Sequence, residues 1–197
     1  MKAIYLVRHC DYSNPRNILV GRLPVELSPT GLKHAERLAN YFSDKKIETI
    51  YSSAVKRCQQ TSEIISNKTI PIRNDQRLLE TFSAYQGYWG GFNKTTQELD
   101  WTKFFDHREV LGGESAHDIQ ARVVSFFTEI LTQPAETILI CSHGDPLYLL
   151  YLHLIGKKDV SDVAIYGELP DYQPKGSIRK ISCKKNNTFE ISPIVEL

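Results

Sequence analysis

Two short apolar segments, each followed by a histidine, most strongly constrain what this chain can fold into. Residues 2–7 lead into Arg8-His9, and residues 137–141 lead through a serine into His143. In open α/β sheets the loops at the carboxyl ends of parallel strands converge on one crevice, so the two histidines are expected to share a site. Two imidazoles and an arginine in one crevice indicate phosphate chemistry.

Strand and helix patterns alternate along the rest of the chain. The expected strands are 2–7, 47–53, 70–72 and 137–141, followed by a closing hairpin of 178–183 and 188–191 around Asn186-Asn187. This alternation predicts an α/β fold of three α/β/α layers around a mostly parallel central sheet, to which the hairpin adds an antiparallel edge. The length of 197 residues suits one domain over 1–197.

Helices are expected where the sequence carries start signals. These signals are Ser28-Pro29, a turn near Ala54, the capping-box pair Ser115 and Asp118 before a helix to about Leu131, and Asp145-Pro146 after the second histidine. Serine and aspartate side chains accept hydrogen bonds from the first free N–H groups of a helix, and proline suits its first turn. We therefore expect Asp145-Pro146 to cap the last helix.

An aromatic-rich segment over about 81–112 interrupts the alternation. Its aromatic side chains lie around Gly87, Gly90 and Gly91. Loops of this kind form active-site lids, so we interpret the segment as a lid or insertion, with Trp89 as a candidate for substrate selectivity. For the aromatic rings themselves, packing beneath the long loop is favoured over a hydrophobic substrate-binding box.

The composition excludes several classes of function. Lys plus Arg is 24 and Asp plus Glu is 23, and a net charge of +1 offers no broad field for nucleic acid or an anionic membrane. No apolar run is long enough for a membrane span, and no signal-peptide pattern is present, so a cytoplasmic protein is expected. The four cysteines are widely spaced without a CxxC pair, which indicates reduced thiols rather than a zinc cage or disulfides.

Phosphoryl transfer requires fixed cations, a nucleophile and a proton donor, and this sequence has candidates for each. Arg8 and Arg57 carry guanidinium groups suited to phosphate oxygens, and Arg57 lies where a strand is expected to turn into a helix. Neighbouring arginines favour a neutral imidazole, so His9 is the expected nucleophile. His143 is the expected hydrogen-bond donor to the transition state, and Glu80 the expected proton donor, a role that spacing alone does not establish.

Several short motifs occur in an order found in a known family. They are Arg8-His9-Cys10, Gly21-Arg22, Leu27-Ser28-Pro29-Thr30-Gly31, the run from Ser52 to Thr61 that contains Arg57, Leu78-Leu79-Glu80, Gly87-Tyr88-Trp89-Gly90-Gly91, Gly112-Gly113-Glu114-Ser115 and Ser142-His143-Gly144. Together they resemble the histidine phosphatase superfamily, with its phosphoglycerate mutase-like fold. The resemblance runs over most of the chain. It implies that His9 becomes phosphorylated and that neither a metal nor another cofactor is needed.

The resemblance also implies roles for binding residues. Phosphate-binding positions correspond to Arg8, Arg57, Asn17 and Gly144, and Arg22 is a candidate for substrate selectivity. The chain departs from the family pattern in three places. Cys10 replaces a glycine, the usual asparagine position is occupied by Pro15 with Asn14 and Asn17 on either side, and the spacing from Glu80 to Gly87 is longer than usual. Of the two asparagines, Asn17 is favoured.

The expected function is a metal-independent phosphomonoesterase in which water hydrolyses a phosphohistidine on His9. A mutase that returns the phosphoryl group to bound product is the first alternative, although such enzymes usually have longer chains. A catalytically silent module that binds a phosphorylated ligand is the second alternative. Phosphorylated small molecules are the expected partners. The sequence identifies neither the physiological substrate nor the oligomeric state.

A cysteine-dependent phosphatase is the third alternative, because Cys10 and Arg16 have Cys-x5-Arg spacing and Asp145-Pro146 resembles an acid loop. That mechanism surrounds phosphate with successive backbone N–H groups. Pro15 has no N–H, and Asp11 places a negative charge nearby, so the spacing is interpreted as a coincidence. The remaining histidines, His34, His107, His117 and His153, belong to no motif and are interpreted as surface or packing residues.

Replacement of Trp89 by alanine is expected to change the ranking of substrates more than general phosphatase activity, because an aromatic lid residue contacts the variable part of a substrate. The measurement is kcat/KM over a panel of phosphate esters for wild type and Trp89→Ala. An unchanged ranking would contradict the selectivity role.

Overall fold

A six-stranded sheet forms the centre of the protein in the computed structural model, which describes residues 2–83, 86–87, 112–160, 169–184 and 188–197. The strands are β1 (Lys2–Arg8), β2 (Thr49–Ser52), β3 (Ile72–Asn74), β4 (Thr137–Ser142), β5 (Ile178–Cys183) and β6 (Phe189–Ile191). Their order across the sheet is β3-β2-β4-β1-β5-β6. The first four in this order pair in parallel, and β5 and β6 add the antiparallel edge.

The parallel strands end at the same edge of the sheet. In the register of β1 with β4, Arg8 lies opposite Ser142, and in the register of β2 with β4, Ser52 lies opposite Cys141. The residue after β1 continues this alignment, because the backbone N–H of His9 donates to the Ser142 carbonyl at 3.0 Å. The chain segments that follow β1, β2 and β4 are therefore brought together at one place.

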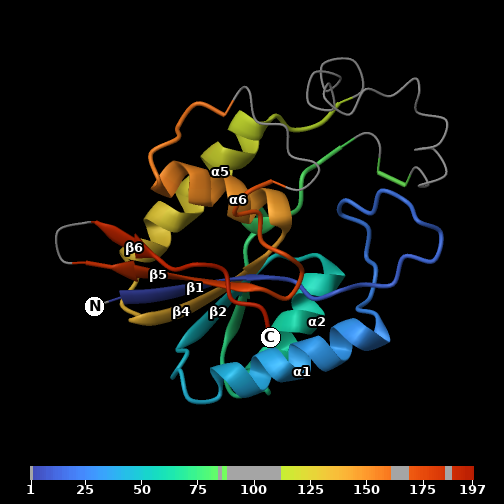
Figure 1. Cartoon of the computed structure of the whole chain (residues 1–197), viewed down its shortest axis with the longest axis horizontal. Helices are drawn as coiled ribbons and strands as arrows, with labels where there is room; N and C mark the ends of the chain where they lie inside the picture. Colours follow the sequence, from blue (N-terminus) through green and yellow to red (C-terminus); the bar gives the residue numbers. More distant parts are fainter. Residues whose placement is uncertain (1, 84–85, 88–111, 161–168, 185–187) are drawn as a thin grey trace.

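Helices cover both faces of the sheet, as Figure 1 shows. The helices are α1 (Pro29–Phe42), α2 (Lys56–Ser66), the short 3-10 helix η1 (Gln76–Leu78), α5 (Ala116–Leu131) and α6 (Gly144–Leu154). Helices α1 and α2 lie below the sheet in Figure 1, and α5 and α6 lie above it. The predicted three-layer α/β/α fold with a mostly parallel sheet is confirmed.

Alternation along β1 divides the core into two clusters. Tyr5 and Val7 pack with the buried faces of α1 and α2, whereas Ile4 and Leu6 pack with α5 and α6. Successive strand residues point to opposite faces, so a strand buried on both sides is apolar throughout. This explains why the first segment of the sequence is a continuous apolar run.

The start signals of α1 and α5 act as expected. The Ser28 side chain accepts from the Gly31 N–H, and Ser115 and Asp118 form a complete capping box. Other boundaries differ from the prediction by about two residues, since α2 begins at Lys56 and β3 spans Ile72–Asn74.

The prediction that Asp145-Pro146 caps α6 was wrong. The N-cap of α6 is His143, which makes no side-chain capping bond, and Asp145 lies inside the first turn. The carboxylate of Asp145 instead accepts hydrogen bonds from the hydroxyls of Thr81 and Tyr172. The Asp145 side chain thus forms tertiary hydrogen bonds rather than the local capping bond that the sequence predicted.

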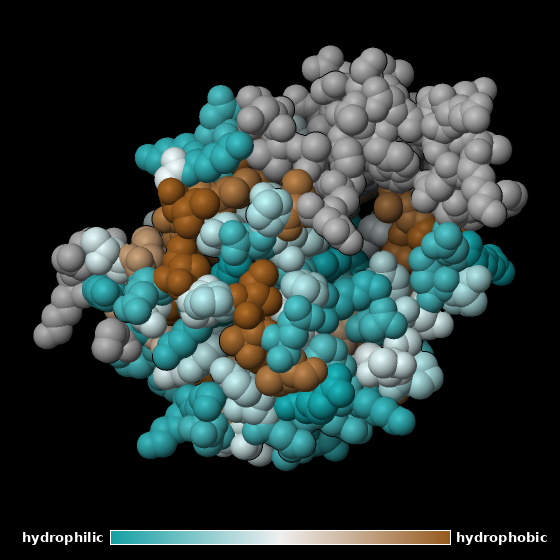
Figure 2. Space-filling view, in the orientation of Figure 1, coloured by the Kyte–Doolittle hydropathy of each residue, from teal (hydrophilic) through white to brown (hydrophobic). Residues whose placement is uncertain are grey.

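Several predicted features lie outside the described residues. These are Trp89 and most of the aromatic segment, His107, and the turn at Asn186-Asn187. Among the residues that the structure places, no helix has both the length and the apolar character to cross a membrane. Figure 2 shows a face on which brown apolar patches are separated by teal polar side chains.

Gly31 is predicted to tolerate no larger side chain. A Cβ at this position would lie 1.9 Å from the carbonyl oxygen of Asp11, which belongs to the loop that follows His9. Gly31→Ala is therefore expected to lower the free energy of unfolding by about 1–3 kcal/mol through steric strain. Urea denaturation measures the change, with the exposed neighbour Thr30→Ala as the control. Equal stabilities of the two variants would contradict this packing argument.

Candidate active site

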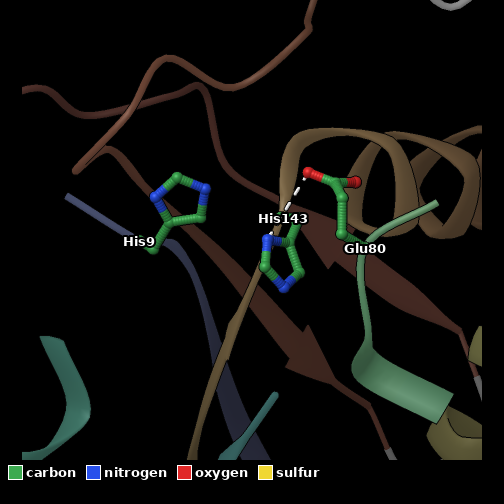
Figure 3. Close-up of side chains that lie close together, drawn as sticks. All are labelled: His9, Glu80 and His143. Carbon is green, nitrogen blue, oxygen red and sulfur yellow. Dashed lines mark ion pairs between the residues drawn. The ribbon is translucent and has the colours of Figure 1, made fainter. Parts of the chain in front are cut away.

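Three side chains from separate elements meet at the carboxyl edge of the parallel strands. His9 follows β1, His143 follows β4, and Glu80 lies after η1 (Figure 3). The two imidazole centroids are 5.1 Å apart, and His143 Nδ1 lies 3.4 Å from Glu80 Oε2, the contact drawn as a dashed line. Both histidines are at most 1% exposed. The structure thus brings together the nucleophile and acid candidates that the sequence indicated.

Arg57 connects these three side chains. From the first turn of α2, its Nε donates to His9 Nε2 at 3.0 Å, and its Nη2 contacts His143 Nδ1 at 2.8 Å and Glu80 Oε2 at 3.5 Å. Nη2 also donates to the carbonyl oxygen of Gly21 at 2.8 Å. The guanidinium is 2% exposed, and its Nη1 has no hydrogen-bond partner within the described part of the chain. A buried donor without a partner is a position at which a ligand oxygen can bind.

These hydrogen bonds select the tautomer of His9. Because Arg57 has only donors, His9 Nε2 must accept, and its lone pair faces the guanidinium. The other ring nitrogen, Nδ1, lies 2.8 Å from the carbonyl oxygen of Cys10 and carries the proton that binds there. His9 therefore presents an unprotonated Nε2 toward the centre of the site.

The same argument applies to His143. Its Nδ1 accepts from Arg57 Nη2, and its Nε2 lies 2.8 Å from the hydroxyl oxygen of Ser53, to which it donates. Cys58 Sγ lies 3.4 Å from the same nitrogen. In the unliganded site His143 is thus a neutral imidazole held by side chains on both of its nitrogens.

Burial and charge shift the pKa values of all three groups. Burial, followed by the positive charges of Arg57 and Arg8, holds the pKa of His9 well below its usual value. Burial and Arg57 lower the pKa of His143 in the same way. For Glu80, burial and the nearby negative charge of Asp145 raise the pKa to about 7. Neutral histidines beside a carboxyl that retains its proton suit nucleophilic attack coupled to proton donation.

Arg8 lies beside the site and contacts the C-terminal part of the chain. Its Nη1 donates to the Gln173 carbonyl at 2.7 Å, and its guanidinium lies 5.1 Å from the centre of the Tyr172 ring. Its Nε is buried without a hydrogen-bond partner in the described structure. Like Arg57 Nη1, this atom is a donor that remains available to a ligand.

Gly144 is required by close packing. It begins α6, where a Cβ would lie 2.0 Å from the hydroxyl oxygen of Tyr172. Arg22, a selectivity candidate, lies close to Glu80: its Nε donates to the Glu80 carbonyl and its Nη2 to Glu114 Oε2, each at 2.8 Å. Its guanidinium also lies 5.4 Å from the centre of the Phe82 ring.

Asn17 is placed differently from the other phosphate-binding candidates. It is exposed, adopts a left-handed conformation with φ 48°, and donates its backbone N–H to the Asn14 carbonyl in a turn. Asn14 itself is engaged with Ile18 through its side-chain amide. Within the described residues, these hydrogen bonds of Asn14 and Asn17 do not connect either side chain to His9.

Several side chains at the site have little or no signal in the sequence. The Tyr12 ring lies 5.6 Å from the His9 ring, with Arg57 at 5.2 Å and Lys175 Nζ at 4.3 Å from its centre. Tyr172 reaches the site from a C-terminal segment that carries no motif. The sequence does carry a signal for Ser53, because this residue belongs to the motif that contains Arg57.

The buried position of Cys10 argues against the cysteine mechanism. Cys10 is fully buried in the cluster beneath α1 and α2, and burial together with Cys141 raises the pKa of its thiol to about 12. Arg16, the partner in the Cys-x5-Arg spacing, is exposed. A cysteine phosphatase needs a thiolate at neutral pH, which this environment opposes.

The two histidines and Glu80 also form a potential metal-ligand group, with candidate ligand atoms within 4.8 Å of one another. Arg57 already supplies a positive charge to this group, since it donates to both imidazoles and pairs with the carboxylate. A divalent cation at the same position would be repelled by the guanidinium. The arrangement therefore favours an anionic ligand.

Comparison with known proteins identifies the family. The sequence model of the histidine phosphatase superfamily (branch 1) matches residues 4–165. The chain belongs to this superfamily. This result confirms the family predicted from the sequence, and with it the prediction of a phosphatase.

Individual relatives agree with this assignment. Phosphoserine phosphatase 1 of Hydrogenobacter thermophilus is 30% identical over 166 residues, covering 79% of this chain and 77% of the relative. A 2,3-bisphosphoglycerate-dependent phosphoglycerate mutase of Cytophaga hutchinsonii is 29% identical over 180 residues, covering 83% of each chain. The structure of YhfR from Bacillus stearothermophilus has a TM-score of 0.82 at 24% identity and covers 98% of this chain and 96% of that chain. The last similarity concerns the fold.

The raised pKa of Glu80 predicts how its replacement changes stability with pH. The ordinary pKa of this carboxyl is 4.5, whereas in the folded protein its pKa is about 7. The unfolded chain therefore loses this proton at a lower pH than the folded protein does, and wild type loses stability as the pH rises from 4.5 to 7. Glu80→Gln removes this loss. The stability of the variant relative to wild type is expected to increase by roughly 1–3 kcal/mol between pH 4.5 and 7.

Urea denaturation at a series of pH values measures this difference. Glu129→Gln, on α5 with a side chain that is 57% exposed, is the matched control. A difference between Glu80→Gln and wild type that stays constant over the interval would contradict the proposed protonation of Glu80.

Proposed function

We propose that this protein is a metal-independent phosphomonoesterase that forms a phosphohistidine on His9. The observation that carries the proposal is the orientation of His9, whose Nε2 lone pair faces Arg57 while its Nδ1 is held by the Cys10 carbonyl. A low pKa keeps this imidazole neutral at physiological pH. Glu80, with its pKa near 7, supplies a proton donor in the same site.

The phosphate group would be bound by donors that lack partners. Arg57 Nη1 and Arg8 Nε are buried and have no hydrogen-bond partner in the described structure. The backbone N–H groups at the start of α6, including that of Gly144, add the positive end of a helix. In the unliganded site Arg57 contacts His9 and His143, and a phosphate oxygen is a stronger acceptor for a guanidinium than a neutral imidazole. Substrate binding thus frees Nε2 for attack.

The reaction then proceeds in two steps. His9 Nε2 forms a bond to phosphorus as the ester P–O bond breaks, and the Glu80 proton passes to the leaving oxygen. Water next forms a P–O bond as the N–P bond breaks, and its proton passes to the Glu80 carboxylate, which restores the enzyme. The donor role expected for His143 requires its other neutral tautomer, in which the Nε2 proton moves to Nδ1 and the Ser53 hydroxyl donates to Nε2. Once phosphate has taken over the contact with Arg57 Nη2, Nδ1 would then donate to a phosphoryl oxygen.

A phosphorylated small molecule is the proposed substrate class, and the cytoplasm is the proposed location. Relatives and structural neighbours named as phosphoserine and glucosyl-3-phosphoglycerate phosphatases support the substrate class. All four cysteines are free, which agrees with a reducing compartment.

A mutase is the second candidate, favoured by the similarity to the Cytophaga hutchinsonii enzyme. Such an enzyme transfers the phosphoryl group from His9 back to a bound product. Release of inorganic phosphate in step with substrate loss distinguishes hydrolysis from this transfer.

Trapping of the phosphoenzyme tests the proposal. With a generic aryl phosphate and excess chelator, wild type is expected to form an acid-labile adduct that His9→Ala lacks, and kcat/KM of His9→Ala is expected to fall at least about 1,000-fold. Cys10→Ser is the matched control and should retain both the adduct and turnover. The adduct is detected by intact-mass measurement after rapid quenching at high and low pH.

Other outcomes overturn the proposal in different ways. An acid-stable adduct that disappears in Cys10→Ser would assign the nucleophile to the cysteine. Activity that chelator abolishes and divalent metal restores would contradict metal independence. Binding of phosphate without an adduct or turnover would favour a catalytically silent module.

A further inference from the structure

Asp145 is a second carboxylate close to the proposed acid, and the reaction described above does not use it. It lies in the first turn of α6, partly buried, where its Oδ2 accepts from the Thr81 hydroxyl at 2.5 Å. Its Oδ1 accepts from the Tyr172 hydroxyl at 2.6 Å. Burial raises the pKa of Asp145 above its ordinary value, and the hydrogen bonds from the Thr81 and Tyr172 hydroxyls act in the opposite direction, because they favour the ionised form.

Thr81 connects Asp145 directly to Glu80. Its hydroxyl donates to Asp145, and its backbone N–H donates to Glu80 Oε1 at 3.0 Å. One residue therefore holds both carboxyl groups, in a place where the Glu80 side chain is only 17% exposed. Two neighbouring carboxyl groups with little access to water do not ionise independently, so a charge on one favours the proton on the other.

We propose that Asp145 is a positioning residue that keeps the proton on Glu80, and that Thr81 and Tyr172 hold Asp145 in its ionised form. The proposal rests on the proposed function, in which Glu80 protonates the leaving group. It assigns to Asp145 an electrostatic role exerted through Glu80, without contact with the substrate.

The other groups around Glu80 act against this effect or are already paired. They are Arg8, Arg22, Arg57, Glu114, Arg122 and the two site histidines. Arg57 and Arg8 favour the ionised form of Glu80, whereas Arg22 and Arg122 both bind the Glu114 carboxylate. The histidines are neutral. After burial itself, the charge of Asp145 is the largest influence that raises the pKa of Glu80.

Tyr172 is placed by contacts that are specific to this arrangement. The Arg8 guanidinium packs on its ring at 5.1 Å, and Arg8 Nη1 binds the carbonyl of the next residue, Gln173. Gly144 leaves room for the hydroxyl, which a Cβ would approach to 2.0 Å. The Tyr172 hydroxyl therefore reaches Asp145 only because residue 144 has no side chain.

The pH dependence of kcat/KM for an alkyl phosphate tests the proposal. Asp145→Asn keeps the shape of the side chain and removes its charge, so Glu80 is expected to lose its proton about one pH unit lower than in wild type. At pH 7 this change lowers kcat/KM about fivefold for the alkyl phosphate. For p-nitrophenyl phosphate, whose leaving group needs little protonation, the loss is expected to stay below about twofold.

Asp44→Asn is the matched control, because it removes one negative charge from an exposed position that follows α1. Its pH profile is expected to coincide with that of wild type. An unshifted profile in Asp145→Asn, with equal losses for both substrates, would overturn the proposal and leave Asp145 a structural role.

Tyr172→Phe provides a second test if Asp145→Asn fails to fold. Removal of one hydrogen bond makes Asp145 easier to protonate, so the profile is expected to shift in the same direction by a smaller amount. A profile of Tyr172→Phe that coincides with that of wild type would count against the proposal.

A direct titration separates failure of this proposal from failure of the proposed function. If wild type shows no turnover, the proposed function fails, and the carboxyl carbon of Glu80 still titrates in a protein labelled with ¹³C-glutamate. Glu80→Gln assigns the signal. A midpoint that is lower in Asp145→Asn than in wild type supports the role of Asp145, whereas equal midpoints overturn it.

Discussion

The buried guanidinium of Arg57 is the interaction on which the rest of the site depends. Removing a cation from water costs several kcal/mol unless its donors are satisfied. Here His9, His143 and the Gly21 carbonyl accept from it, and Glu80 pairs with it. Because each imidazole must accept from Arg57, the guanidinium selects both tautomers. Removing it would change the protonation of the site as well as its charge.

The electrostatics of the site oppose stability and favour chemistry. Two histidines are buried beside arginines that oppose their protonation, and Glu80 is buried close to Asp145. The charged forms of these groups have a higher free energy in the folded protein than in water, which is typical of functional sites. The surrounding three-layer core, packed on both faces of the sheet, holds them in place.

Much of the fold and part of the site were predictable from sequence because the relevant signals are local. The apolar run of β1, the N-cap at Ser28 and the capping box at Ser115 each depend on residues a few positions apart. Convergence of His9 and His143 followed from a general property of parallel sheets. The cap expected at Asp145-Pro146 was wrong because α6 already begins at Gly144, and the Asp145 carboxylate binds two hydroxyls that are distant in the sequence.

The sequence by itself determined the α/β class and the family, and it proposed the two histidines, Arg57 and Glu80 as site residues, because these inferences depend on short motifs and on strand ends. The tertiary structure alone decided the imidazole tautomers, the shifted pKa values and the pairing of Asp145 with Thr81 and Tyr172. Most of the contacts behind those properties join residues separated by 27 to 90 positions. No local pattern encodes such contacts, since they exist only after the layers have packed.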